Sequence, residues 1–138
     1  MRPITKITIL GTRLGVIVLV SYWILIFVGT HIPDVPDAAP KINDKVLHFG
    51  AFFGLTFFLC YVSKPAPRWL RFGRIAILAL CYAGIDEYTQ QFVPRRHPDW
   101  MDVLADASGI VTAIVLYVLA QHVFQYFWKT QPQSQTAS

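Results

Sequence analysis

Four long apolar stretches alternate with short polar segments along this chain. The apolar stretches run over about residues 14–30, 46–63, 73–93 and 102–127. Each approaches the roughly 20 residues that a helix needs to cross a hydrocarbon core about 30 Å thick. Prolines fall in all three connections, where they interrupt helices. The pattern predicts an all-α fold, a four-helix transmembrane bundle.

We expect one transmembrane domain over residues 1–128, followed by a polar, disordered tail over residues 129–138. The first apolar stretch follows basic residues, as a secretory signal would. However, its apolar run exceeds the usual 7–15 residues, and the GTHIPD that follows is a poor cleavage site. We therefore expect this stretch to be retained as a helix.

Composition supports a bilayer environment. Of the 138 residues, 54% are hydrophobic and only 14% are charged, whereas soluble domains carry about 25% charged residues. This composition excludes a disordered chain. The net charge of +4 comes from so few charges that a bilayer is a better partner than nucleic acid.

Lys and Arg residues predict the orientation, because they concentrate in cytoplasmic loops. Of the twelve in the chain, eight fall on the side that carries both termini, so we expect both termini to be cytoplasmic. The eight are Arg2, Lys6, Arg13, Lys64, Arg68, Arg71, Arg74 and Lys129. The other four, Lys41, Lys45, Arg95 and Arg96, fall outside.

Titratable residues interrupt the last three apolar stretches near their outer ends. They are His48, Asp86, Glu87, Asp102 and Asp106. A charge at the bilayer centre costs about 2.5–3.5 kcal/mol on insertion scales, so such residues face the bundle interior and have partners. The pattern therefore predicts a closed polar pocket that opens to the outer surface.

Helical spacing places these residues on shared faces. The fourth stretch has Asp102, Asp106, Gly109 and Ala113 at intervals of 4, 3 and 4. The third has Ala79, Ala83, Glu87 and Gln91 at intervals of 4. Asp44 lies four residues before His48, where its carboxylate can orient or charge the imidazole. Arg95 and Arg96 follow the third stretch and can neutralise helical carboxylates.

Structural roles are the alternative for several of these residues. Asp102 can serve only the helix N-terminus and its dipole. Asp86 can simply hydrogen-bond Gln90 or Tyr82, and His48 can be a structural histidine. His31, His97 and His122 lack supporting neighbours. Gly50 and Gly54 form a G-x-x-x-G that permits close helix approach, and Cys60 and Cys81 are expected to be buried thiols.

Familiar catalytic and metal-binding motifs are absent from the sequence. It has no H-E-x-x-H, no phosphate loop and no G-x-S-x-G. One histidine with several carboxylates (His48, Glu87, Asp102 and Asp106) can suit a divalent ion, but these residues have no ligand-spacing signature. We therefore predict no metal site and no cofactor.

Three ordered strings in the chain resemble the VanZ-like family of small bacterial membrane proteins. They are DKVLHFGAFF at residues 44–53, DEYTQQFVPRR at 86–96 and DWMDVLADASG at 99–109. The matching residues are Asp44, Lys45, His48, Phe49, Glu87, Gln90, Phe92, Pro94, Arg96, Asp102 and Gly109. Two positions depart from the pattern: Asp106 stands where many relatives carry Asn, and Arg95 stands where they carry Gly.

The resemblance implies a multi-pass protein of the bacterial plasma membrane, and it implies no particular reaction. The founding member of the family is associated with low-level resistance to the glycopeptide teicoplanin. Because many members occur outside resistance clusters, we do not assign resistance to this chain.

The sequence is compatible with three functions. The first is binding or processing of a cell-envelope component, such as a lipid-linked precursor, whose anionic head group would meet Arg95 and Arg96. The second is an intramembrane hydrolase or transferase with Glu87 or His48 as general base. The third is a proton or ion pathway, or a structural membrane partner. The candidate ligand-binding residues are Asp44, Lys45, His48, Glu87, Gln90, Arg95, Arg96, Asp102 and Asp106.

Overall fold

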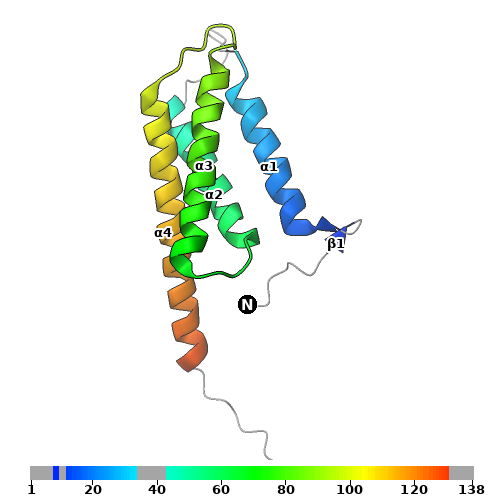
Figure 1. The fold of residues 1–138 in the computed structure, drawn as a ribbon, viewed down its shortest axis with the longest axis vertical. Helices are drawn as coiled ribbons and strands as arrows, with labels where there is room; N and C mark the ends of the chain where they lie inside the picture. Colours follow the sequence, from blue (N-terminus) through cyan, green and yellow to red (C-terminus); the bar gives the residue numbers. More distant parts are fainter. Residues whose placement is uncertain (1–7, 10–11, 34–42, 131–138) are drawn as a thin grey trace, which may run out of the picture.

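The described part of the chain folds into four helices that run alternately up and down (Figure 1). The computed structural model describes residues 8–9, 12–33 and 43–130. The helices are α1 (Leu14–Thr30), α2 (Asp44–Val62), α3 (Arg68–Gln90) and α4 (Trp100–Thr130). Two short antiparallel strands, β1 (Thr8–Ile9) and β2 (Thr12–Arg13), precede α1. The predicted helical fold is confirmed.

The helix boundaries show how local capping places the polar residues. Helix α1 has the predicted bounds, but α2 begins at Asp44 rather than residue 46, because the Asn43 side chain accepts the N–H of Lys45 at 3.0 Å. Helix α4 begins at Trp100 rather than residue 102, because the Asp99 carboxylate accepts the N–H of Met101 at 2.9 Å. Helix α3 begins and ends earlier than predicted.

Two of the four helices are long and apolar enough to cross a membrane by length and composition: Asp44–Val62, and Trp100–Phe127 within α4. Helix α1 is apolar but has 17 residues, about 26 Å at 1.5 Å per residue. Helix α3 has 23 residues, and five of them are charged. Residues 131–138, most of the predicted polar tail, lie outside the described residues, and α4 extends to Thr130.

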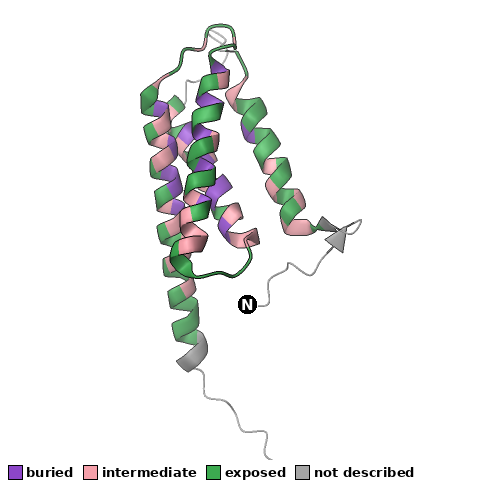
Figure 2. Ribbon diagram, viewed as in Figure 1, coloured by how far each residue is buried: buried purple, intermediate pink, exposed green. Residues whose placement is uncertain are grey.

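The most extensive helix contact joins α2 and α4. It depends on Gly109, because a Cβ atom there would lie 2.5 Å from the Phe49 carbonyl oxygen and 3.0 Å from the Phe53 nitrogen. The buried residues line the inner faces of the helices (Figure 2). The apolar core consists of Ile26, Phe52, Leu55, Ala79, Ala83 and Ile110. At Gly109, the backbones of α2 and α4 thus meet without an intervening side chain.

Only one glycine of the G-x-x-x-G pair mediates a close helix contact. Beside Gly54 lies the Tyr22 hydroxyl of α1, which would collide with a Cβ atom, whereas Gly50 has open space. The Tyr22 hydroxyl also donates to the Ala51 carbonyl at 3.3 Å. The expectation of two buried thiols holds for Cys60 but is wrong for Cys81, which is exposed on α3.

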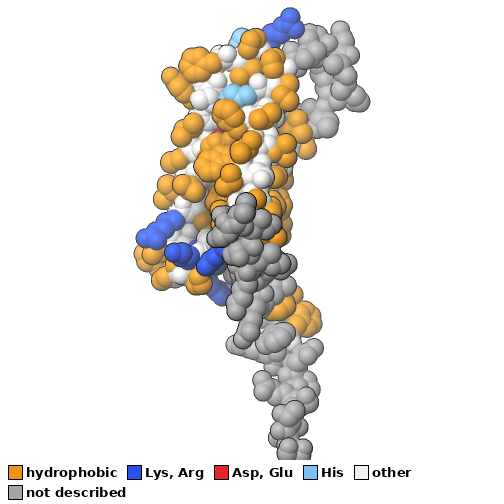
Figure 3. Space-filling view, turned by 90° about the vertical axis from the view of Figure 1, so that its right-hand side faces the viewer, with side chains coloured by type: hydrophobic (Ala, Val, Ile, Leu, Met, Phe, Trp, Pro, Cys, Tyr) orange, Lys and Arg blue, Asp and Glu red, His pale blue; other side chains and the backbone are white. Residues whose placement is uncertain are grey.

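Apolar side chains cover the face of the molecule that carries α1, and Lys and Arg side chains gather toward its lower end (Figure 3). On α1 alone, Ile24, Leu25 and Val28 are each more than half exposed, at 59%, 65% and 53%. An apolar surface of this extent on a soluble monomer would mark an interaction site. The outer face of the bundle therefore suits an apolar environment.

The α2–α4 contact predicts that two glycine substitutions differ in their effect on stability. Gly109→Ala should lower the free energy of unfolding by about 1–3 kcal/mol, because its methyl group meets backbone atoms that cannot move aside independently. Thermal unfolding of the detergent-solubilised protein measures the effect. Gly84→Ala is the matched control, because its added methyl group meets no atom within 4 Å. Equal unfolding temperatures for the two variants would contradict the proposed role of Gly109.

Candidate functional site

Of the buried polar residues that the structure describes, nearly all lie at one end of the bundle, where α1 and α3 end and α2 and α4 begin (Figure 1). We call this region the polar end. Its buried polar residues are His48, Asp86, Glu87, Gln90, Asp102 and Asp106. Helices α2, α3 and α4 thus each contribute at least one titratable side chain, as the hydrophobic pattern predicts.

A buried histidine–aspartate pair joins α2 to α4. His48 Nδ1 lies 3.0 Å from Asp106 Oδ1, and the two side chains are only 2% and 1% exposed. Asp106, rather than the sequence neighbour Asp44, therefore makes the hydrogen bond to this imidazole. His48 Nε2 and Asp106 Oδ2 have no hydrogen-bond partner among the described residues. The pair leaves one imidazole nitrogen available to a ligand.

Lys45 bridges two carboxylates across the same interface. Its Nζ atom donates to Asp99 Oδ2 at 2.6 Å and to Asp102 Oδ1 at 2.9 Å. The hydrogen bond from Lys45 lowers the pKa of Asp99 below its ordinary value. Asp102 therefore does more than serve the α4 N-terminus. Asp99 is not among the site residues predicted from the sequence, although an acid directly before an apolar helix is a capping signal that identifies it.

Glu87 connects α3 to the start of α4. Its Oε1 atom accepts the backbone N–H of Asp99 at 2.5 Å, and its Oε2 atom has no partner among the described residues. Helical spacing predicts that Gln91 lies on the same buried face as Glu87, but Gln91 is exposed and Gln90 is buried instead. Glu87 is thus held in place by one oxygen while the other remains available.

A second buried carboxylate, Asp86, joins α3 to α1. It accepts hydrogen bonds from Gln90 Nε2 at 2.9 Å and from the Tyr82 hydroxyl at 3.4 Å, the two partners that the sequence suggested. The Thr30 hydroxyl also donates to Asp86 at 3.0 Å. His31 has no supporting neighbours in the sequence, but its Nε2 atom lies 3.0 Å from the Thr89 hydroxyl. These contacts fix the end of α1.

The two neighbouring arginines have different environments. Arg96 Nη1 donates to Gln90 Oε1 at 3.0 Å, and its Nε donates to the Ile32 carbonyl at 3.3 Å. Its Nη1 also lies 3.6 Å from Asp44 Oδ2. Arg95 is exposed and has a φ of 67°. That conformation suits glycine, which explains the Gly that the family resemblance places there. The structure brings Arg96, but not Arg95, into the site.

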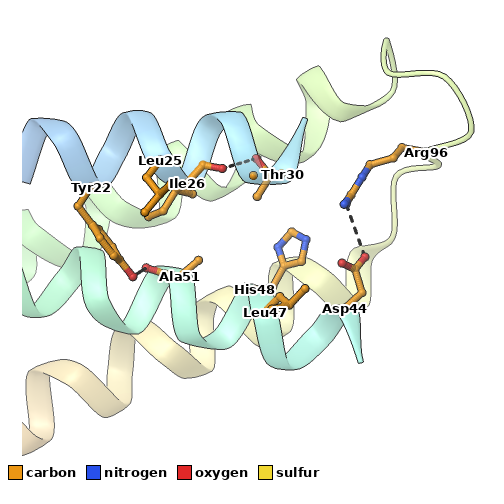
Figure 4. Close-up of a pocket in the computed structure, with 10 residues that line it drawn as sticks. Tyr22, Leu25, Ile26, Thr30, Asp44, Leu47, His48, Ala51 and Arg96 are labelled. Carbon is orange, nitrogen blue, oxygen red and sulfur yellow. Dashed lines mark hydrogen bonds and ion pairs between the residues drawn. The ribbon is translucent and has the colours of Figure 1, made fainter. Parts of the chain in front are cut away.

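A cavity of about 240 Å³ lies between α1 and α2 at the polar end (Figure 4). Asp44, His48 and Arg96 form its polar part, and Leu25 and Leu47 belong to its apolar wall. The apolar lining also includes Tyr22, Ile26 and Ala51. The cavity therefore has a polar part, near Asp44, His48 and Arg96, and an apolar wall formed by side chains of α1 and α2.

One group of side chains in the described part of the chain has the geometry to hold a metal ion. It comprises Asp44, His48 and Asp102, whose ligand atoms all lie within 4.8 Å of one another. Glu87 and Asp106, which the sequence analysis also considered as ligands, are not part of this group.

Comparisons with known proteins agree with the three motifs. The family model described as VanZ/LLP1 matches residues 17–121. An uncharacterized protein of Schizosaccharomyces pombe is 31% identical over 104 residues, which cover 74% of this chain and 63% of the yeast protein. The chain thus spans less than two thirds of that relative, and the resemblance extends beyond bacteria. No solved structure matches. The chain belongs to the VanZ/LLP1 family.

Proposed function

We propose that this protein is a multi-pass protein of the bacterial plasma membrane that binds the head group of an anionic lipid, such as a lipid-linked envelope precursor, at its polar end. The cavity between α1 and α2 is the observation that carries the proposal, because its polar and apolar surfaces match those of an amphiphile. Family membership supports the membrane setting.

The surface of the helices supports membrane insertion. In the apolar windows of α2 and α4, only 28% and 22% of the residues are buried. The core helix of a soluble protein would be mostly buried, whereas these helices present apolar side chains outward. Helices α1 and α3 pack antiparallel beside them (Figure 1). We infer that all four helices cross the bilayer, with the charged residues of α3 near its two ends.

The charge distribution supports an outward-facing polar end. Lys64, Arg68 and Arg74 are exposed at the opposite end, around the α2–α3 connection. Lys and Arg residues concentrate on the cytoplasmic side of membrane proteins. The polar end, and the cavity with it, therefore faces outward in this proposal, and both termini are cytoplasmic.

Arg96 is the residue best placed to meet an anionic head group. Its hydrogen bonds to Gln90 and to the Ile32 carbonyl hold the guanidinium beside the cavity. A positioned guanidinium can bind phosphate through two parallel hydrogen bonds. A cavity of about 240 Å³ has room for a phosphate group and the first methylenes of a chain. Leu25 and Leu47 would contact those methylenes.

A hydrolase or transferase is the second candidate, and the free oxygen of Glu87 favours it. Glu87 Oε2 is buried without a partner among the described residues, as is His48 Nε2. Such groups can accept a proton from water or a hydroxyl group. A proton pathway has less support, because Thr56 is the only described buried polar side chain away from the polar end.

Orientation can be measured by cysteine labelling in a background in which Cys60 and Cys81 are replaced by alanine. In intact cells, a membrane-impermeant maleimide should label His97→Cys, which lies at the polar end, but not Lys64→Cys. Permeabilised cells provide the control, because both positions are exposed and should then react. Labelling of Lys64→Cys alone in intact cells would contradict the proposed orientation.

Lipid binding should depend on Arg96 and not on its neighbour. We expect Arg96→Ala to weaken binding of a polyprenyl phosphate about ten- to hundredfold, because it removes a charge-assisted hydrogen bond. Arg95→Ala is the matched control, since Arg95 lies outside the cavity lining. Native mass spectrometry of the protein with polyprenyl phosphate, and with diacylglycerol as a neutral comparison, measures the effect. Equal binding by both variants would count against the proposal.

Turnover distinguishes the second candidate from binding alone. If the protein is an enzyme, Glu87→Gln should abolish release of phosphate from a phosphorylated lipid. The amide oxygen can still accept the Asp99 N–H, so the fold should persist. Asp86→Asn, at the neighbouring buried carboxylate, should retain the activity. Absence of turnover by the wild-type protein, or unchanged turnover in Glu87→Gln, would argue against this function.

A further inference from the structure

The polar end contains more acidic than basic side chains. Among the described residues there, six carboxyl groups stand against three permanent cations, Lys45, Arg95 and Arg96. The six belong to Asp44, Asp86, Glu87, Asp99, Asp102 and Asp106. Four of the acids, Asp86, Glu87, Asp102 and Asp106, are buried. Buried charges are normally paired or coordinate metals. The region thus has the charge balance of a site that accepts a further cation.

We infer that Asp44, His48 and Asp102 bind a divalent cation. The three side chains come from the first turns of α2 and α4, and their ligand atoms lie within 4.8 Å of one another. Metal–ligand distances near 2.0–2.2 Å would require these atoms to move slightly closer together. Asp102 has a suitable atom, because Lys45 bonds only its Oδ1 atom.

His48 provides independent evidence for a ligand at this position. The side chain is 2% exposed, and its Nε2 atom has no hydrogen-bond partner among the described residues. Its Nδ1 atom instead pairs with the Asp106 carboxylate at 3.0 Å. Metal-binding histidines usually have this arrangement, in which a carboxylate fixes the ring and the other nitrogen binds the metal. His48 and Asp106 form such a pair.

The ligand set favours Mn²⁺ or Zn²⁺. Carboxylate oxygens suit Mg²⁺, Ca²⁺ and Mn²⁺, whereas imidazole suits Zn²⁺ and other transition metals. Two carboxylates with one imidazole therefore select a cation that accepts both kinds of ligand. With only three protein ligands, the ion would retain further coordination positions for water or for a ligand atom.

Cation binding would also change the role of Arg96. The Arg96–Asp44 pair is long, at 3.6 Å, so a metal ion can replace Arg96 as the partner of Asp44. Asp44, His48 and Arg96 all line the cavity. The ion and the released guanidinium could then both contact a phosphate group. This last step rests on the proposed lipid-binding function, whereas the cation site itself does not.

Metal binding can be measured without any lipid. The full chain is purified in detergent, stripped with a chelator and titrated calorimetrically with MnCl₂ or ZnCl₂. We expect one ion per chain and a loss of affinity of more than about tenfold in Asp44→Asn and His48→Gln, since even outer-shell changes cost 10- to 100-fold. Asp86→Asn is the matched control at a buried carboxylate outside the group, and its affinity should be unchanged.

A spectroscopic measurement on the wild-type protein does not depend on how the variants fold. Pulsed electron paramagnetic resonance of bound Mn²⁺ should show coupling to the ¹⁴N nucleus of one imidazole. No ion bound, an ion without nitrogen coupling, or equal affinity in all variants would each overturn the cation site. Metal binding without polyprenyl phosphate binding would instead contradict the proposed function alone, and lipid binding without a metal would contradict the cation site alone.

Discussion

The close approach of α2 and α4 at Gly109 determines the geometry of the polar end. No side chain separates the two backbones there. Asp106 lies about one helical turn before Gly109, and its Oδ1 atom is therefore only 3.0 Å from His48 Nδ1 on α2. The same approach allows Lys45 to reach both Asp99 and Asp102. A wider interface would separate these pairs and leave the buried carboxylates of Asp102 and Asp106 without these partners. The close packing of α2 and α4 is thus also what keeps the charged side chains of the polar end paired.

Periodicity predicted the helices and their buried faces well, because both depend on residues close in sequence. On α4, Asp102, Asp106 and Ala113 are buried as their spacing indicated, and Gly109 lies against α2. The partner of His48 could not be predicted in this way. Asp44 is four residues away, but Asp106, 58 residues away, makes the hydrogen bond. That choice depends on how two helices pack, which their separate patterns do not specify.

The turn after α3 illustrates a second limit. Arg95 and Arg96 are equivalent by composition, yet Arg95 adopts a left-handed backbone conformation while Arg96 reaches back to the helix ends. A sequence motif identifies which residues occur together but not which side chain points inward. The glycine that the family pattern has at position 95 indicates which arginine turns away, because glycine readily adopts a positive φ.

The buried atoms without partners distinguish a site from a purely structural network. The Asp86 network has a donor for each carboxylate oxygen, as expected of a contact that only holds α1 to α3. Four buried side-chain atoms have none among the described residues, and three of them lie at the polar end: His48 Nε2, Glu87 Oε2 and Asp106 Oδ2. The fourth, Thr56 Oγ1, lies farther along α2. An unsatisfied buried polar group costs about 1–3 kcal/mol, which is large against total stabilities of about 5–15 kcal/mol. A bundle selected for stability alone would favour apolar residues here, and the ligands proposed above would supply partners for these side chains.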